Sequence, residues 1–563
     1  MQYQREDFYI LYNNWLYNDA VHEVMKITGD KVKEAVHLMK AGKSDLSGGF
    51  TSDSLINAPV EVFNMLALVY RSWLIHGTVT NSLLACSFLP LLKNALKDPA
   101  STNSYRAIAG SSLLLKLFDK LVLLLWGHLV ISDSLQFGYK TMTGTTQCSW
   151  LLMEVVGHFQ RSGNNPIVTL LDCSRAFDVC RFSTIFSRLL DRKLPPIVVR
   201  TLMVAYTEQY AWTKWGSAKS DIFSIKNGTR QGSVLSAAVF SMYVDPLLVE
   251  LRARGLGCHV AGVFMGALGY CDDLALVSPS RDSMLEMLNV CEKFAKLTGL
   301  TFSTDPNPSK SKTKCIFMCG RKTGLAKPAP LTLDGKMLPW VPSATHLGHE
   351  IHESGTMELD ARQKKYKFIS DSVDIRETFG FASPTEVLRA IKVYCGAFYG
   401  SMLWDLGGPG AGQVFKSWNT CIKLTWQVPR ATRSYFVDQL LASDVTSVKT
   451  DIMTRYTKFL KSLNNSPSSE VSIMANIASR DVRSVTGSNI AHIFAITGLD
   501  PRHASPNDIK TVSNMLRSEP DHIDSWRIPY LAKLLTWRGE KHFVSDDKLV
   551  SEFTNLINSL CIN

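Results

Sequence analysis

The sequence predicts a mixed α/β (α+β) fold, with an antiparallel sheet in the middle of the chain and helical regions on either side of it. Two observations support this expectation. Short apolar runs rich in β-forming residues occur in the middle, first PIVTLLD (166–172) and then two runs separated by YCDD (270–273). Before and after them, apolar residues recur at the spacing of amphipathic helices, and no internal repeat is visible.

Turn and cap residues set the limits of these elements. A Gly-Asn-Asn-Pro turn leads into the run 166–172, which predicts a strand ending at Asp172. The run 233–255 has helical apolar spacing and ends at a glycine, so a helix is expected there. YCDD lies between two apolar runs and predicts a β-hairpin with acidic residues at its turn. Asp282 is placed to cap a helix whose apolar stripe continues to Gly299.

The other segments have different textures. Residues 305–328 predict a basic loop that contains a short strand at CIFM, and the chain beyond about residue 355 is helical in texture. The Pro- and Ser-rich stretch NNSPSSE (464–470) predicts a linker. The most apolar segment, 111–130, contains three charged side chains, which favours an amphipathic core helix over a membrane span. No membrane partner is therefore expected.

The composition is that of an ordinary folded protein with a basic balance. Of 563 residues, 45% are hydrophobic and 20% charged, and 61 Lys plus Arg face 50 Asp plus Glu, a formal charge of +11. This excess favours polyanionic partners. The 12 cysteines form no CxxC pair and no CCHC cluster, so neither a disulfide framework nor a zinc finger is indicated. The N-terminus lacks a signal-peptide layout, so we expect an intracellular protein of the nucleus, the cytoplasm or both, and not a secreted one.

Three carboxylates occupy positions that suit metal-dependent chemistry. Asp172 ends a predicted strand, whereas Asp272 and Asp273 lie at a predicted hairpin turn. Two-metal phosphoryl or nucleotidyl transfer requires carboxylates that converge from separate elements on two ions about 4 Å apart. Magnesium prefers oxygen ligands and keeps substrate phosphates or waters in its shell, so three carboxylates would suffice. An isolated Asp-Asp at a turn usually just faces solvent, so the neighbouring motifs have to decide.

Five segments resemble, in chain order, motifs A to E of the reverse transcriptases of the LINE-type, non-LTR class. They are LLDCSRAFD (170–178), NGTRQGSVLS (227–236), GYCDDLALV (269–277), KSKTKCIF (310–317) and HLG (346–348). Upstream, segments 40–55, 90–109 and 136–147 resemble the extended fingers of that class, so the resemblance covers roughly residues 35–355. It departs at Cys271, where alanine is common, and at His346, where an aromatic residue often stands. Neither departure removes a metal ligand.

The resemblance implies a right-hand polymerase with fingers, palm and thumb. The antiparallel sheet would form the palm, followed by a helical C-terminal region. The implied division is an N-terminal extension (1–34), extended fingers (35–160), a palm with motifs A to E (161–352, within a reverse transcriptase domain at about 75–355), a helical thumb (353–463) and a C-terminal helical region of unknown role (464–563).

The resemblance also implies the roles of the acidic residues and of one aromatic residue. Asp172 and Asp272 would be catalytic metal ligands, and Asp273 the second hairpin carboxylate at the same site, holding two Mg²⁺ ions or alternatively Mn²⁺. Phe177 matches the aromatic gate beneath the incoming sugar, where a bulky ring would clash with a 2′-hydroxyl. That position would select dNTPs over NTPs. The alternative for Phe177 is an ordinary buried phenylalanine on a strand.

Further residues match nucleotide-binding positions of the class. Gln231 and Gly232 match the motif B pair that lines the nucleotide and template, where glycine permits close backbone approach. Arg106 and Lys140 match fingers positions that can reach the triphosphate or template. Lys312 is the preferred motif D lysine, which would support the departing pyrophosphate, although neighbouring lysines leave the register open.

The segment around HLG has two interpretations. Leu347 and Gly348 match the tight hairpin that grips the primer end, and the alternative is an ordinary β-turn. His346, His349 and His352 superficially suggest a metal cluster. Because side chains alternate along a strand, we expect the three imidazoles to be scattered and no zinc to be bound.

The implied function is that of an RNA-directed DNA polymerase that copies RNA into cDNA. Its partners would be an RNA template, a DNA primer or target and dNTPs, and its reaction would be target-primed. An endonuclease module would act in trans or lie on a missing part of a longer polyprotein, because the fingers resemblance leaves no room for one before Asp172.

Two alternatives remain open. A group II intron-like reverse transcriptase with a maturase region would use the same palm. The segments LDCSRAFD, SYRAIA and FSTDPNPSKSKTKC, however, resemble those of LINE elements. A decayed copy that only binds RNA would have lost an aspartate, and none of the three is missing.

Overall fold

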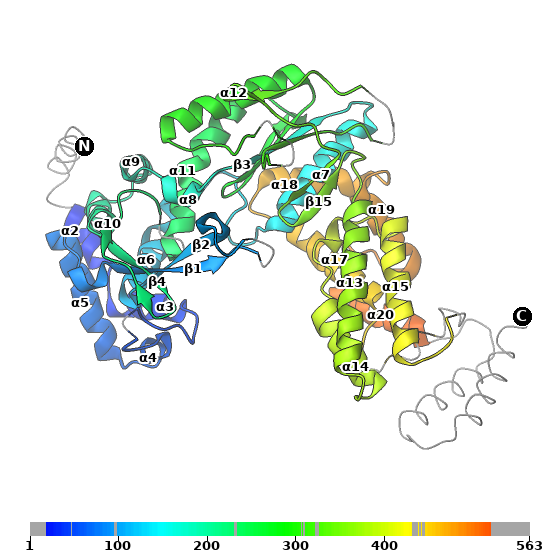
Figure 1. The fold of residues 1–563 in the computed structure, drawn as a ribbon, viewed down its shortest axis with the longest axis horizontal. Coiled ribbons are helices and arrows are strands. Elements are labelled where there is room, and N and C mark those ends of the chain that lie inside the picture. The colour runs from blue at the N-terminus through cyan, green and yellow to red at the C-terminus, as the bar shows by residue number, and fades with distance from the viewer. Residues whose placement is uncertain are drawn as a thin grey trace, which may run out of the picture.

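The computed structural model describes residues 19–518, with gaps at 47, 95–97, 230–232, 306, 308–309, 321–325, 431–436, 438–440 and 442–444. Figure 1 shows an arch of three parts. The N-terminal helices and a first sheet form one leg, the C-terminal helices form the other, and a second sheet that contains β3 lies between them. The mixed α/β content expected from the sequence is confirmed.

The first leg combines helices with a five-stranded sheet. Its helices are α2 (Asp19–Met25), α3 (Gly29–His37), α4 (Ser52–Ile56), α5 (Val60–His76) and α6 (Leu113–Trp126). Its strands are β1 (Ala85–Leu92), β2 (Tyr105–Ser111), β4 (Tyr210–Trp215), β5 (Ala218–Lys219) and β6 (Phe223–Ser224). Strand β1 runs antiparallel to β2 and parallel to β4, so a segment from the middle of the chain completes this sheet. Helix α6 is the amphipathic core helix expected in 111–130.

The second sheet is antiparallel with strand order β11-β3-β10-β9. Its strands are β3 (Ile167–Asp172), β9 (Ala267–Tyr270), β10 (Asp273–Ser278) and β11 (Lys314–Phe317), and the short strands β7 (His259–Val260) and β8 (Val263–Phe264) form a separate pair. Helices α7 (Thr145–Arg161), α11 (Val234–Ala253) and α12 (Arg281–Thr298) pack against it. Helices α8 (Ala176–Val179) and α9 (Phe182–Asp191) follow β3, and α10 (Pro196–Thr207) packs on α9 and on α5 of the first leg. Because α7, α11 and α12 pack against this sheet, successive residues of β3 and β10 are buried. That explains why these strands are continuous apolar runs and not alternating ones.

The predicted elements of this region are confirmed, with one correction at a cap. The strand ending at Asp172, the hairpin around YCDD and the helices predicted in 233–255 and 282–299 are all present. The cap of α12 is Ser280, whose hydroxyl accepts from the backbone N–H of Ser283, and not Asp282 as expected. Asp282 lies in the first turn, where a negative charge still favours the helix.

The second leg is almost entirely helical. It follows two hairpins, β12 (Thr332–Leu333) with β13 (Lys336–Met337) and β14 (Ser343–His346) with β15 (His349–His352). Its helices are α13 (Glu358–Thr378), α14 (Pro384–Cys395), α15 (Pro409–Thr425), α17 (Val448–Asn464), α18 (Ser469–Arg480), α19 (Val485–Thr497) and α20 (Pro506–Ser518). Short 3-10 turns occur at η1 (Asn81–Leu83), η2 (Thr102–Ser104), η3 (Gly127–Leu129) and η4 (Ser401–Leu403).

The expected linker at 464–470 is wrong. This stretch is a tight connection between α17 and α18, in which the buried Ser468 hydroxyl caps α18. Buried Glu470 ion-pairs with Arg252 of α11, with 3.4 Å between Oε1 and the guanidinium. Serine and proline here serve as a helix cap and a stop, so composition alone could not distinguish a packed connection from a flexible one.

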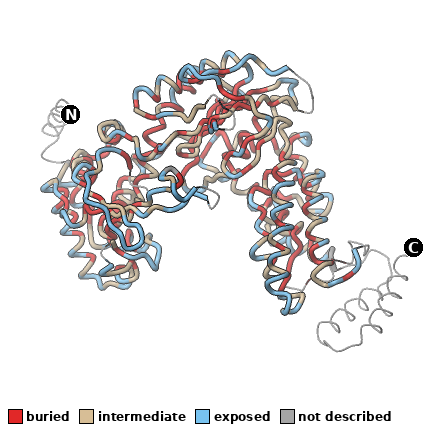
Figure 2. The backbone as a smooth tube through the Cα atoms, in the orientation of Figure 1, coloured by how far each residue is buried: buried red, intermediate tan, exposed pale blue. Residues whose placement is uncertain are grey.

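One continuous apolar core runs through the described part of the chain, and a small second cluster of Cys86, Ala109 and Ala211 lies in the first sheet. Figure 2 shows the buried backbone concentrated at the second sheet and along the facing sides of the helices. Among the described residues, α11 alone is long and apolar enough to cross a membrane, and 67% of its most apolar stretch is buried inside the protein. That degree of burial is usual for a core helix.

Candidate active site

The structure brings the three predicted aspartates together at one end of the second sheet. Asp172 is the last residue of β3 and Asp273 the first of β10, and the two lie directly opposite each other in the antiparallel register. Asp272 precedes Asp273 in the turn from β9. Cross-strand neighbours have Cβ atoms about 4.5–5.5 Å apart, so their carboxyl groups share one region of space. We call these three residues the aspartate site.

The turn that carries Asp272 is tight and strained. Tyr270 pairs with Asp273, which leaves a two-residue loop of Cys271 and Asp272. Cys271 has a φ of 56°, in the left-handed region that non-glycine residues rarely adopt. Its side chain is buried, with Sγ 3.9 Å from the Ser241 hydroxyl of α11. Strained conformations of this kind persist only where surrounding contacts fix them, and they cluster at functional sites.

The aspartate site carries more negative charge than its protein neighbours balance. Burial, followed by repulsion from Asp272 and Asp172, raises the pKa of Asp273 to about 6. The pKa of Asp272 is also raised, chiefly by burial and further by Asp172, while Arg106 and Lys312 act in the opposite direction. Crowded carboxylates of this kind are what a bound cation would stabilise.

The register of the second sheet identifies the lysine that reaches the site. Strand β11 pairs with β3 so that Lys314 lies opposite Leu170. Two residues earlier, Lys312 extends its amine to within 3.3 Å of Asp172 Oδ2, and its side chain remains 66% exposed. The structure therefore favours Lys312 within the basic run, and an exposed amine here is free to turn from the carboxylate to a phosphate group.

The two fingers cations differ in their placement. Arg106 lies exposed on β2, and its charge is near enough to Asp272 to lower the pKa of that carboxyl. The amine of Lys140 instead donates to the backbone carbonyl of Asp133. It lies within a second group of charges that we call the arginine-paired cluster, consisting of Asp133, Asp245, Glu470, Arg192 and Arg252.

The present surroundings of Lys140 therefore do not support its predicted role at the nucleotide. Its side chain is partly buried among the groups of the arginine-paired cluster, and burial lowers the pKa of its amine. In this arrangement the Lys140 amine stabilises the fold around Asp133, and it does not lie at the aspartate site. We therefore leave Lys140 out of the proposed nucleotide site.

Phe177 lies beside the aspartates but not on a strand. It belongs to the short helix α8, after β3, and its ring stacks on Phe240 of α11 with 4.5 Å between centroids and 26° between planes. Its carbonyl accepts from the backbone N–H of Thr229 at 2.6 Å. Gly228, with a φ of 93°, packs so closely on this segment that a Cβ would come 2.9 Å from the Phe177 carbonyl oxygen. Motif B is therefore bound directly to motif A. The predicted Gln231 and Gly232 lie outside the described residues.

The HLG segment forms the turn of the β14–β15 hairpin. Leu347 and Gly348 have φ values of 49° and 79°, and two such residues define the type I′ turn that matches strand twist. Tyr399 donates its hydroxyl to the Leu347 carbonyl at 3.0 Å, and Lys364 donates its amine to the Gly348 carbonyl at 2.9 Å. The Tyr399 hydroxyl also lies 2.6 Å from that of Thr145, at the start of α7. Sequence reasoning missed Tyr399, because no local pattern links it to a turn some fifty residues earlier.

The histidines are partly brought together, contrary to expectation. His346 and His349 lie directly opposite each other at the hairpin turn, whereas His352 lies opposite Ser343. Both imidazoles of the pair are buried without a hydrogen-bond partner, and burial lowers the pKa of His346 to about 4. The ring of His349 stacks on Tyr399 at 4.7 Å. The pair is therefore packed as apolar material beneath the turn.

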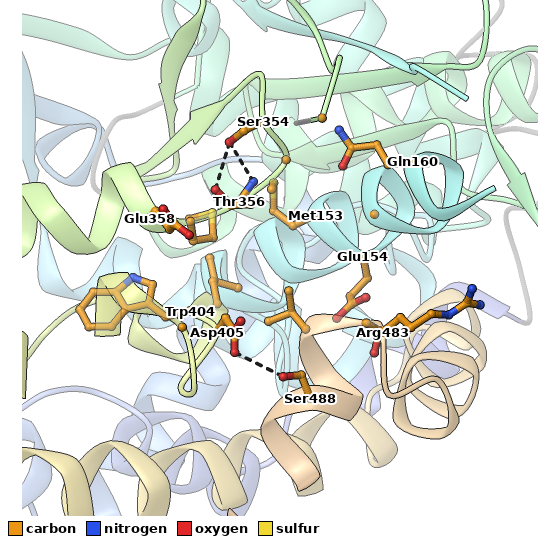
Figure 3. Close-up of a pocket in the computed structure, with 18 of the residues that line it drawn as sticks. Met153, Glu154, Gln160, Ser354, Thr356, Glu358, Trp404, Asp405, Arg483 and Ser488 are labelled. Atoms are coloured by element: carbon orange, nitrogen blue, oxygen red, sulfur yellow. Dashed lines mark hydrogen bonds between the residues drawn. The ribbon is translucent and has the colours of Figure 1, made fainter. Parts of the chain in front are cut away.

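A large cavity lies elsewhere in the molecule. About 530 Å³ of space lies between α7, the segment after β15 and the first turns of α13, α15 and α19 (Figure 3). Buried Glu154 accepts from the N–H and hydroxyl of Thr486 at 3.0 and 2.6 Å, and Asp405 lies 3.4 Å from the Ser488 hydroxyl. None of the residues predicted for the site lines this cavity. This cavity and the crowded carboxylates are thus at different places, and we place the chemistry at the carboxylates, because charge and strain converge there.

The donor set of the aspartate site fits divalent metal ions. Among the described residues no group of three or more His, Cys, Asp or Glu side chains lies close enough together to hold a metal ion by itself. Magnesium in phosphoryl-transfer sites is usually held by one or two carboxylates together with substrate phosphates, and not by a complete protein cage. Raised carboxyl pKa values and the amine of Lys312 beside Asp172 show that positive charge is favoured here.

Comparison with known proteins agrees with this geometry. Residues 93–351 match the family model described as reverse transcriptase (RNA-dependent DNA polymerase). The chain is also similar to the Retrovirus-related Pol polyprotein from type-1 retrotransposable element R2 of Popillia japonica. One alignment is 24% identical over 316 residues, covering 52% of this chain and 44% of the polyprotein. Another match of the same name is 24% identical over 182 residues, covering 31% of this chain and 28% of the polyprotein.

The matched residues include β2, the second sheet and the aspartate site, so the chain contains a reverse transcriptase domain. Such a domain uses an RNA template and a nucleic-acid primer and depends on divalent metal ions. The relative that resembles it, the R2 polyprotein, is named as the product of a type-1 retrotransposable element. The chain spans less than half the length of the curated relatives that it matches.

Proposed function

We propose that this chain is the RNA-directed DNA polymerase of a non-LTR retrotransposon and extends a DNA primer with dNTPs along an RNA template. In the proposed arrangement the second sheet with α11 and α12 is the palm, the first leg is the fingers and helices α13 to α17 are the thumb. The observation that carries the proposal is the aspartate site, because three carboxylates gather where two paired strands meet at a strained turn, and Lys312 is the described cation in contact with them.

Asp172, Asp272 and Asp273 would hold two Mg²⁺ ions, or Mn²⁺ in their place. When bound, these ions would polarise the attacking hydroxyl and offset charge on the triphosphate. Lys312 and Arg106 supply positive charge around the same site, where it would support the departing pyrophosphate. Phe177 is held by Phe240 and by the motif B backbone. We propose that its ring excludes a 2′-hydroxyl.

The β14–β15 turn would position the primer end. Its carbonyls are held by Tyr399 and Lys364, and Tyr399 also contacts Thr145 at the start of α7. A turn fixed from two sides can present Leu347 and Gly348 in one defined geometry, which a primer-gripping element requires. We further propose that first-strand synthesis is target-primed, with nicking by an endonuclease module in trans or in another part of the polyprotein, inside the cell.

Primer extension with the purified chain tests the proposal. On poly(rA) with an oligo(dT) primer, we expect extension with dTTP in Mg²⁺, none in EDTA, and little with UTP. A chain that binds the template but does not extend the primer under any divalent ion would contradict the proposed activity and favour a non-catalytic RNA-binding role.

A further inference from the structure

The strained turn of the aspartate site is held by a segment that lies outside motifs A to E. Residues 135–138 run beside β9 at the outer edge of the second sheet, where Phe137 donates its N–H to the Gly269 carbonyl at 2.7 Å. The Gly269 N–H in turn donates to the Leu135 carbonyl at 2.8 Å. This pair of bonds makes a parallel bridge between Gln136 and Gly269. The segment therefore acts as an additional short strand along β9, on the side of β9 that does not face β10.

From this position Gln136 reaches the turn itself. Its side chain is fully buried, and its Oε1 accepts from the backbone N–H of Cys271 at 2.8 Å. The same oxygen accepts from the N–H of Gly138 at 3.1 Å, which fixes the carboxamide in its own loop. The Cys271 N–H belongs to the residue with positive φ that precedes Asp272. One side-chain oxygen thus binds both strands of the contact.

The packing around this contact leaves no room for another arrangement. A Cβ on Gly138 would come 2.6 Å from Cys271 Sγ and 2.8 Å from the Cys271 nitrogen. A Cβ on Gly269 would come 2.9 Å from Gln136 Nε2. That nitrogen is buried without a hydrogen-bond partner, so the carboxamide is kept at a cost in stability. The buried Gln136 carboxamide thus contributes little to the stability of the core. Its hydrogen bond to the Cys271–Asp272 turn is the better reason for its presence.

We propose that Gln136 is a positioning residue, whose carboxamide holds the Cys271–Asp272 turn in the strained conformation that directs Asp272 into the aspartate site. This inference rests on the proposed function for its effect on catalysis, but the hydrogen bond to the turn can be tested without activity. Gln136 does not touch the reacting atoms. Its loss therefore leaves every carboxylate present and affects their alignment.

Gln136→Met removes the acceptor and keeps the length of the side chain. Groups that orient metal ligands typically cost about 10- to 100-fold in activity or metal affinity when replaced. We expect kcat for dTTP to fall within that range, the Mg²⁺ concentration for half-maximal activity to rise, and KM for primer–template to change less than about twofold, since the template surface is untouched. The matched control is Gln209→Met, a buried glutamine that also has an unpartnered Nε2 and that lies before β4.

A pair of glycine variants tests the same contact sterically. Gly138→Ala places a methyl group against the Cys271 backbone and should reproduce the loss of kcat. Gly144→Ala, in the same loop, meets nothing within 4 Å and has extended backbone, so it should retain activity. Equal losses in both glycine variants would show that the loop tolerates no change and would overturn the specific role of the turn contact.

Hydrogen–deuterium exchange on the metal-free, full-length chain is the deciding measurement. We expect the peptide that contains Cys271 to exchange at least about tenfold faster in Gln136→Met than in the wild type, because its N–H loses its acceptor. In Gln209→Met the same peptide should be unchanged. Unchanged exchange in Gln136→Met together with unchanged kcat would overturn the inference. A wild-type chain with no polymerase activity but with this difference in exchange would instead overturn the proposed function and leave the contact to the turn established.

Discussion

The aspartate site and the arginine-paired cluster each contain an aspartate whose pKa is raised to a similar value, but the neighbouring groups act on these two pKa values in opposite directions. Burial raises the pKa of Asp273, in the aspartate site, and of Asp245, in the arginine-paired cluster, to about 6. The next influences on Asp273 are two further carboxylates, which raise its pKa again. Those on Asp245 are a hydrogen bond from the Asp133 N–H and the Arg192 guanidinium, 2.7 Å away, which lower it.

This difference separates an active site from a structural network better than burial does. In the arginine-paired cluster, Arg252 makes two bonds of 2.7 Å to Asp133 and reaches Glu470 of α18, so the acids join α11 to the C-terminal helices. In the aspartate site, the exposed amine of Lys312 at 3.3 Å is the one protein cation in contact among the described residues. Acids that the protein leaves unbalanced are available to a ligand, whereas balanced ones are already used.

Removing a carboxylate from the aspartate site should have the largest effect on activity. We expect Asp172→Asn or Asp272→Asn to reduce Mg²⁺-dependent extension on the order of a thousandfold, since loss of a metal ligand costs several kcal/mol of transition-state stabilisation. The fold should survive, as judged by circular dichroism. Asp282→Asn, at a side chain that is 90% exposed in the first turn of α12, is the matched control. Substantial primer extension by either variant would contradict the assignment of these aspartates as metal ligands.

Breaking the arginine-paired cluster should affect stability and not chemistry. Arg252→Met leaves Asp133 and Glu470 buried without their shared cation, which we expect to lower the free energy of unfolding by about 2–3 kcal/mol. That is below the full cost of a broken buried pair, because the Arg252 side chain is 35% exposed. Arg254→Met, which breaks an exposed pair with Glu250, should cost less than about 1 kcal/mol. Denaturant unfolding measures both, and equal effects would contradict the contrast between the clusters.

Phe177 tests whether the site selects deoxynucleotides. Phe177→Ala should open space beneath the sugar and raise the use of UTP relative to dTTP by about 10- to 200-fold, the range that one steric contact provides. Phe182→Ala, which removes a ring that packs on Phe186 and Tyr206, controls for lost aromatic packing. Incorporation of UTP and dTTP is compared on one RNA template in Mg²⁺. An unchanged preference would make Phe177 an ordinary core residue.

The smallest expected effect concerns the metal-free site. The Asp273 carboxyl has a pKa of about 6 in the folded protein against 3.8 in the unfolded chain, so its charged form opposes folding at neutral pH. In EDTA at pH 7.5, Asp273→Asn should be more stable than the wild type by about 1 kcal/mol after allowance for solvent screening. This gap should begin to narrow as the pH falls below 6, where the folded wild type binds the proton, and should close near pH 4, where the unfolded chain binds it too. Thermal unfolding at both pH values checks it, and a wild type that is more stable at pH 7.5 would indicate a structural role for Asp273.

The sequence predicted the local parts of this structure and the site that depends on them. The strand before Asp172, the YCDD hairpin and α11 each have their own pattern of apolar spacing and turn residues, so they could be recognised without tertiary information. The antiparallel register then places Asp273 opposite Asp172, so the carboxylates converge as a consequence of two local predictions. The division into fingers, palm and thumb remains a proposal.

What could not be predicted depends on contacts between distant segments. Lys140 was assigned to the nucleotide because its motif matched, but a helix far along the chain supplies Glu470 and makes its surroundings structural. No sequence pattern indicates Tyr399, and the resemblance of segment 136–147 does not indicate what Gln136 does, since both roles come from the carbonyl and the N–H that these side chains reach. The prediction of a linker at 464–470 is wrong for the same reason. Local composition predicts where a turn forms, but the residues that the turn packs against depend on the whole fold.

The most direct test of the contrast between the two acid clusters is the location of a bound divalent cation. Crystals of the full chain soaked in Mn²⁺ and measured at the manganese absorption edge would show the ion by its anomalous signal. We expect a peak between Asp172 and the Asp272–Asp273 turn in the wild type and its loss in Asp272→Asn, with no peak at Asp133, Asp245 or Glu470. A peak at the arginine-paired cluster, or none at the aspartate site when Mn²⁺ is in excess, would contradict the account.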